Sequence, residues 1–114
     1  MGKDIFALKN IISYCEDIED TIERFGDEES FIEDKHYRDL CSFYMIQIGE
    51  NIKALSEKTR EDHPGIRWRG FRETRDDIAH KYHKVDIEKI WFTVAEEIPA
   101  LKEKCEEILR EIRS

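Results

Sequence analysis

The sequence predicts an all-α protein, an antiparallel helical bundle of four main helices with a kinked C-terminal helix. Apolar residues recur at steps of three and four along most of the 114 residues, the spacing that places side chains on one face of a helix. No stretch alternates between apolar and polar residues as a half-buried strand would. The 5 Gly and 2 Pro leave few helix-breaking positions. We expect a single domain over residues 1–114.

Composition excludes several classes of protein. Charged residues make up 40 % of the chain and hydrophobic residues 39 %, a balance typical of globular rather than transmembrane or disordered proteins. No apolar run approaches the roughly 18 residues that cross a bilayer, and the acidic start makes a poor signal peptide, so we expect a cytoplasmic protein without membrane contact. Cys15, Cys41 and Cys105 are far apart and form no C-x-x-C pair, which indicates buried free thiols.

The first helix is predicted over residues 3–25, where Gly26 ends a regular apolar repeat. A short turn capped by Asp27 is expected next, through Phe31 and Ile32. The members of the first repeat are Ile5, Leu8, Ile12, Cys15, Ile18, Ile22 and Phe25.

The second helix is predicted over residues 37–55, and Phe43, Met45 and Ile46 widen its apolar face. A helix apolar over so much of its circumference is expected to be covered by its own bundle and by a second subunit. Its repeat consists of Tyr37, Leu40, Cys41, Tyr44, Ile48, Ile52 and Leu55.

Residues 56–65 are predicted to be a loop, since Pro64 disfavours a helical residue before it and Gly65 is a second helix-breaking residue. A shorter third helix is predicted over residues 66–79.

The fourth helix is predicted to begin after Asp86, its N-cap, and to continue through Ile112. Pro99 lies inside it, lacks a backbone donor and crowds the carbonyl of Ala95, so we expect a kink there.

Charge is distributed unevenly. The net charge of −8 argues against a protein that coats nucleic acid by bulk electrostatics. Residues 60–84 are the exception, with seven basic and five acidic residues, which leaves −10 for the rest of the chain. Three of the four histidines, His63, His80 and His83, also lie in this window. Groups that can meet a phosphate or move a proton near neutral pH are therefore concentrated there.

Arg75 and His80 are the candidate catalytic pair in this window. Metal-independent RNA cleavage needs a base for the 2′-hydroxyl, an acid for the leaving oxygen and a cation for the developing phosphorane charge. Five residues along one helix separate two side chains by about 140°, so the pair would converge only if the helix ended or distorted near His80. A two-fold dimer that used the apolar face of residues 37–55 would instead bring two copies of each together.

The segment around this pair resembles a known family. Arg75, His80 and Tyr82 fit the pattern R-x4-H-x-Y of the HepT-like toxins, which belong to the HEPN superfamily of all-helical ribonucleases. The resemblance covers nearly the whole chain. Supporting matches are IGENIKALS at residues 48–56, Val85-Asp86 before Ile90-Trp91, and Pro99 before Leu101.

The resemblance implies a homodimeric toxin that cuts RNA in a composite cleft without a metal or cofactor. Carried over, Arg75 binds and stabilises the scissile phosphate, and His80 acts as general acid or base. Asp76 occupies the polar position after the arginine, where it would orient Arg75 or His80. Apart from the resemblance, Arg72 is a candidate contact to the RNA backbone, as are Arg67 and Arg69 around Trp68.

The resemblance also implies a partner, an MntA-type nucleotidyltransferase antitoxin that transfers AMP from ATP to the tyrosine matching Tyr82. In an extended segment His80 and Tyr82 would point to the same side, so AMP there would place bulk and negative charge where RNA phosphate must lie. The alternative is that Tyr82 packs against the last helix.

Other interpretations stay open at this point. The chain could be a non-catalytic HEPN partner of a nucleotidyltransferase, or a helical scaffold without a site. Asp76, His80 and His83 have a spacing that could suit a metal, although no fourth ligand is evident. Two residues of the second helix, Glu50 and Asn51, could reach a dimer cleft or simply face solvent.

Trp68 stands among arginines and could stack on a base, but core packing is the better interpretation.

Overall fold

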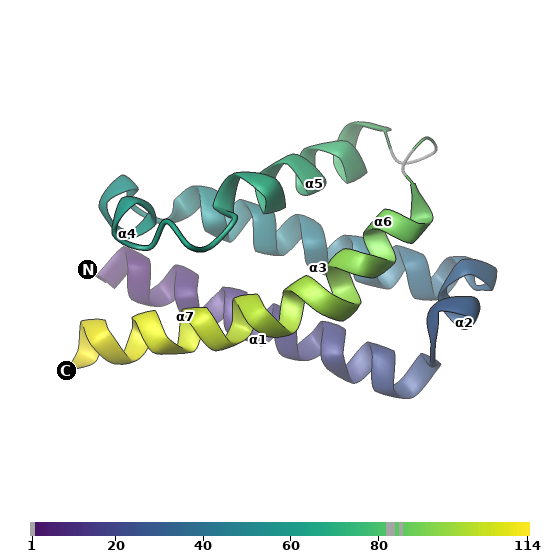
Figure 1. Ribbon diagram of the computed structural model, residues 1–114, viewed down its shortest axis with the longest axis horizontal. Coiled ribbons are helices and arrows are strands. Elements are labelled where there is room, and N and C mark those ends of the chain that lie inside the picture. The colour runs from purple at the N-terminus through teal and green to yellow at the C-terminus, as the bar shows by residue number, and fades with distance from the viewer. Residues whose placement is uncertain (1, 82–83, 85) are drawn as a thin grey trace.

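The computed structural model describes residues 2–81, 84 and 86–114, and it confirms the all-α class. Four long segments run alternately in opposite directions, so both ends of the chain lie at one end of the bundle (Figure 1). In chain order the elements are α1 (Gly2–Phe25), α2 (Glu28–Glu33), α3 (Lys35–Ala54), α4 (Glu57–Asp62), α5 (Trp68–Lys81), α6 (Ile87–Phe92), the π-helical turn η2 (Thr93–Glu97) and α7 (Ile98–Arg113). No helix in the described part of the chain is long and apolar enough to cross a membrane.

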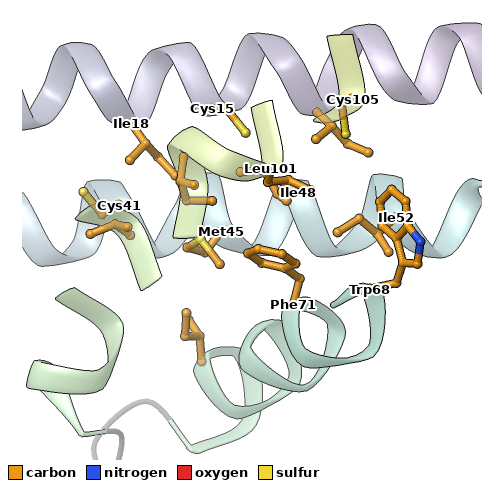
Figure 2. Close-up of a cluster of buried hydrophobic side chains, with 14 of the residues drawn as sticks. Cys15, Ile18, Cys41, Met45, Ile48, Ile52, Trp68, Phe71, Leu101 and Cys105 are labelled. Carbon is orange, nitrogen blue, oxygen red and sulfur yellow. The ribbon is translucent and has the colours of Figure 1, made fainter. Parts of the chain in front are cut away.

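The core lies between α1, α3, α5 and α7. Helix α1 packs against α3 and α7, and α5 packs against the other side of α3. Figure 2 shows side chains from all four helices meeting in this core. The three cysteines are buried free thiols, as predicted. Burial raises the pKa of Cys15, and it raises the pKa of Cys41 and of Cys105 to about 12, so these thiols stay protonated at neutral pH.

Local signals explain the turn between α1 and α3. Gly26 has a φ of 109°, a conformation that glycine adopts without strain, and it ends α1 where predicted. Asp27 caps α2 by accepting a hydrogen bond from the Ser30 amide at 3.1 Å. Asp34 caps α3 by accepting from the His36 amide at 2.9 Å, so this helix begins two residues earlier than predicted.

The apolar face of α3 divides between core and surface. Met45 is buried, Ile46 is half-buried, and Phe43 points outward with 52 % of its surface exposed. The ring of Phe43 lies edge-on to Tyr44 with the centroids 5.7 Å apart. A second subunit on this face remains a prediction.

The prediction of a loop over residues 56–65 was wrong in its first half. Ser56 caps α4 by accepting from the Thr59 amide at 3.2 Å, and the helix continues to Asp62. Pro64 and Gly65 act only on the segment around them, because a proline restricts the residue before it and not the preceding turn.

Just before Pro99, where the sequence predicted a kink, the backbone forms a π-helical turn between α6 and α7. The Ile98 amide donates to the Thr93 carbonyl, five residues back rather than four. Pro99 has no amide hydrogen to donate to Ala95, so a wider turn is the local solution. Asp86 caps α6 by accepting from the Glu88 amide at 3.0 Å, as predicted.

Candidate functional site

Helix α5 carries both Arg75 and His80, and it places them apart. The helix buries Trp68, Phe71 and Ile78 toward the core and continues to Lys81 without ending before His80. Five helical residues separate the two side chains by about 140° in direction and about 7.5 Å along the axis. His80 is exposed, and no hydrogen bond or ion pair joins it to Arg75 within the described residues. A single chain therefore does not bring the pair together.

Arg75 lies against α3 at Gly49. A β-carbon at Gly49 would be only 2.6 Å from the Arg75 Cγ and closer still to its Cβ, so only glycine leaves room for this side chain. The Arg75 side chain is 25 % exposed, and its Nε is buried without a hydrogen-bond partner among the described residues. The stem of the arginine is thus held by packing, while its outer nitrogens remain available for polar contacts.

Two carboxylates take those outer nitrogens. Glu50 of α3 pairs with the Arg75 Nη2, and Asp76 pairs with Nη1 at 3.0 Å. Asp76 thus contacts Arg75, one of the two residues that it was predicted to orient. Asp76 is 62 % exposed, so its pair lies at the surface, where ion pairs are weak. Glu50 is 44 % exposed and joins Arg75 from the neighbouring helix. Glu50, for which the sequence left open a dimer cleft or solvent, thus pairs with Arg75 of its own chain.

Arg72 and Asp76 share an open pocket on α5. The pocket has a volume of about 620 Å³, and the two side chains stand one helical turn apart on its wall. The other wall and floor residues are Arg60, Glu61, Pro64, Ile66, Arg67, Trp68, Arg69 and Glu73. Four arginines, three acidic residues and several apolar side chains therefore line one pocket. The pocket lies beside the ion pair between Arg75 and Asp76.

Three of the four arginines of this pocket are tied to nearby acids or carbonyls. Arg69 pairs with Glu73 at 3.1 Å, Arg67 pairs with Glu97 at 2.6 Å, and Arg60 donates to the Ile52 carbonyl at 3.0 Å. Arg72 is exposed and has no ion pair within the described part of the chain. Of the four arginines that line the pocket, Arg72 is therefore the one free to meet an anion.

Tyr82 and His83 lie outside the described residues, so the predicted modification site and the third ligand of the metal alternative have no structural account here. Among the described residues, no group of three His, Cys, Asp or Glu side chains could hold a metal ion. Trp68 is 6 % exposed and its indole donates to the His63 carbonyl at 3.1 Å, which confirms its interpretation as a core residue.

Asp4 organises the end of the bundle where α3 meets α4, and sequence reasoning missed it. Its buried carboxylate accepts from the Ser56 amide at 2.8 Å, the Ser56 hydroxyl at 2.7 Å and the Thr59 hydroxyl at 2.6 Å. Burial alone raises the pKa of Asp4, but the hydrogen bonds from Thr59 and Ser56 outweigh it and the pKa is lowered. The Ser56 cap was readable in the sequence, whereas its partner 52 residues away was not.

His63 joins the segment after α4 to the end of α7. Its Nδ1 lies 2.8 Å from the Thr59 carbonyl oxygen and its Nε2 lies 3.1 Å from a Glu111 carboxylate oxygen. Partial burial opposes protonation, but acceptors at both ring nitrogens raise the pKa of His63 above its ordinary value. This histidine thus has a structural role, although the sequence placed it in the same window as His80.

Comparison with known proteins identifies the family. The family described as "Ribonuclease HepT-like" matches residues 11–108. A protein of Thermococcus cleftensis named "Probable ribonuclease HepT" is 37 % identical over 101 residues, which cover 83 % of this chain and 92 % of that protein. A protein of Methanocaldococcus jannaschii that is provisionally named an RNase is 32 % identical over 111 residues, which cover 96 % of this chain and 95 % of that protein.

A third relative, from Caldanaerobacter subterraneus subsp. tengcongensis, is also provisionally named an RNase and is 30 % identical over 103 residues, which cover 90 % of this chain and 91 % of that protein. No solved structure matches the chain. The family match includes α5 with Arg75 and His80, together with the Gly49–Glu50 segment that contacts Arg75. The chain belongs to the HepT-like ribonuclease family.

Proposed function

We propose that this protein is a metal-independent endoribonuclease, the toxin of a toxin–antitoxin system, and that it acts as a homodimer. Membership of a ribonuclease family and the RNase names of the relatives support the reaction class. The proposed site is a composite cleft that contains Arg75 and His80 from each of two chains.

The separation of Arg75 and His80 on α5 is the observation that carries this proposal. One chain supplies a cation held against α3 and an imidazole turned about 140° away from it, which together cannot act on one phosphate. A two-fold dimer supplies the missing geometry, because each chain then adds an arginine and a histidine to a shared cleft.

The chemistry needs two proton transfers and one charge stabiliser. One His80 takes the proton of the 2′-hydroxyl, and the 2′-oxygen attacks phosphorus. The bond from phosphorus to the 5′-oxygen breaks, and the second His80 gives that oxygen a proton. Arg75 stabilises the negative charge that develops on the non-bridging oxygens. The products are a 2′,3′-cyclic phosphate and a 5′-hydroxyl end.

Arg72 and Asp76 have supporting roles in this proposal. Arg72, exposed on the wall of the pocket beside Arg75, contacts an RNA phosphate that flanks the scissile one. Asp76 holds the Arg75 Nη1 in the free protein and gives way when phosphate arrives, since an exposed pair is weak.

Control of the toxin rests on Tyr82. A nucleotidyltransferase antitoxin of the MntA type neutralises the protein both by binding it and by transferring AMP from ATP to the Tyr82 hydroxyl, with pyrophosphate as the leaving group. The added phosphate and nucleoside then compete with RNA for the cleft. The R-x4-H-x-Y pattern supports this part of the proposal.

A second candidate function is that of a non-catalytic partner of a nucleotidyltransferase. One observation favours it, namely that carboxylates occupy both outer nitrogens of Arg75 in a chain whose net charge is −8. An arginine balanced in this way needs a strong competitor before it binds phosphate.

The test is RNA cleavage by the purified protein in excess EDTA, beside His80→Ala and the control His36→Ala. His36 is also exposed, at the start of α3. We expect cleavage by the wild type and by His36→Ala, and none by His80→Ala. If the folded wild-type dimer cuts no RNA, the ribonuclease proposal fails and the binding-partner function takes its place.

A further inference from the structure

Gly49 makes a close approach between α3 and α5 possible. Any larger residue would overlap the Cβ and Cγ of Arg75, whereas a β-carbon at Gly65 would meet no atom within 4 Å. Glycine in the interior of a helix destabilises that helix relative to alanine. Glycine at position 49 therefore lowers the stability of α3 but leaves the space that the Arg75 stem occupies.

Glu50 ties the far end of that arginine to α3. Asp76 belongs to the same helix as Arg75 and moves with it, so its contact cannot fix the guanidinium relative to the rest of the bundle. Glu50 is the next residue after Gly49 and pairs with Nη2 from the neighbouring helix. Packing on Gly49 and pairing with Glu50 together restrain both ends of the arginine side chain.

The Nε of Arg75 agrees with this restraint. It is buried and lacks a hydrogen-bond partner among the described residues. No hydrogen bond from Nε therefore explains where the side chain lies. An unpaired buried donor costs free energy. The side chain keeps this position because its stem packs on Gly49 and its Nη2 pairs with Glu50.

We infer that Gly49 and Glu50 are positioning residues for Arg75, and that they hold its guanidinium ready for the scissile phosphate. This inference rests on the proposed function, since it assigns the reason for holding Arg75 to RNA cleavage. A charged side chain that is placed before substrate arrives loses less entropy and needs less reorganisation in the transition state. Glu50 itself touches no reacting atom in this scheme.

The first test compares cleavage by Glu50→Ala, Glu50→Gln and the control Glu23→Gln, an exposed residue of α1. We expect Glu50→Ala to lower kcat by about 10- to 100-fold with a smaller change in KM, because a misplaced group fails mainly in the transition state. Glu50→Gln should recover most of kcat, since its amide oxygen can still accept from Nη2. An unchanged kcat in Glu50→Ala would overturn the inference while leaving the ribonuclease proposal intact.

The second test does not depend on cleavage. The Arg75 Nε–H signal is assigned in a nitrogen-15 NMR spectrum by its disappearance in Arg75→Lys, and its exchange with water is then followed. We expect slow exchange in the wild type and in Gly65→Ala, and loss of the signal by fast exchange in Gly49→Ala and Glu50→Ala. If Nε–H stays equally protected in both variants, the inference is wrong. If the wild type cuts no RNA, this readout still decides whether the two residues hold Arg75.

Discussion

The carboxylate of Asp4 accepts hydrogen bonds from both the amide and the hydroxyl of Ser56, and so connects the first turn of α1 to the start of α4. Asp4 also accepts from the Thr59 hydroxyl, in the first turn of α4. The contact closes the end of the bundle opposite α2 (Figure 1). Its place between two helices far apart in the sequence makes it a sensitive point for stability.

Asp4→Ala is therefore expected to lower the free energy of unfolding by about 1–3 kcal/mol, because three donors lose a buried acceptor. Urea denaturation at pH 7 measures this, with Asp20→Ala, an exposed aspartate of α1, as the control. The pKa of Asp4 is lowered in the folded state, so its ionised form contributes fully above the unfolded value of about 3.9. The difference between wild type and variant should shrink as the pH falls through the folded pKa; a constant difference would contradict this assignment.

The pair between His63 and Glu111 should make stability depend on pH in the opposite direction. The folded pKa of His63 is raised, so its stabilising charge is fully present below the unfolded value of about 6.5 and is lost as the pH rises through the folded pKa. We expect Glu111→Gln to be less stable than wild type by at most about 1 kcal/mol at pH 6, because Glu111 is largely exposed. Thermal unfolding between about pH 6 and 9 should show the gap closing, and Glu103→Gln, on the same helix, should show no gap.

A composite cleft predicts how activity responds to mixed subunits. If one cleft uses both copies of His80, a dimer with one wild-type chain and one His80→Ala chain lacks either the acid or the base. An equimolar mixture that pairs at random should then retain about 25 % of wild-type activity, whereas independent chains would retain about 50 %. Co-refolded mixtures at several ratios measure the curve, and a linear dependence would contradict the shared cleft.

Arg72→Ala is expected to weaken RNA binding without abolishing the chemistry. The side chain is exposed on the wall of the pocket beside Arg75, where it would neutralise one RNA phosphate. KM should rise, and the slope of log KM against log salt should decrease by about 0.7 for single-stranded RNA. Arg113→Ala, another exposed arginine near the end of the chain, should leave both quantities unchanged. The same salt slope in wild type and Arg72→Ala would remove Arg72 from the RNA path.

Tyr82→Phe separates cleavage from its control. The variant keeps the ring and loses the hydroxyl that would receive AMP, so it should cut RNA and resist the part of the inhibition by the antitoxin that requires ATP. Intact mass spectrometry should find one added AMP per wild-type chain and none on Tyr82→Phe, with Tyr14→Phe modified as wild type. Addition of AMP to Tyr82→Phe would show that another residue is the acceptor.

Much of the fold could be predicted because its signals are local. The apolar repeats located the first, second and fourth long helical segments, Gly26 and Asp86 marked two of their ends, and Pro99 marked the distorted region. The short helix α4 was missed because its stability depends on Asp4, a residue of another helix. Its own cap at Ser56 was a weaker signal than Pro64 and Gly65 nearby.

The candidate site divides in the same way. The sequence alone determined which groups could do the chemistry, since Arg75, His80 and Tyr82 stand in a recognisable pattern, and it determined that the first two cannot converge on a regular helix. Only the tertiary structure decided what surrounds Arg75. Gly49 and Glu50 reach it across a helix–helix contact, and such a contact depends on the packing of side chains distant in sequence, which spacing along one helix does not encode.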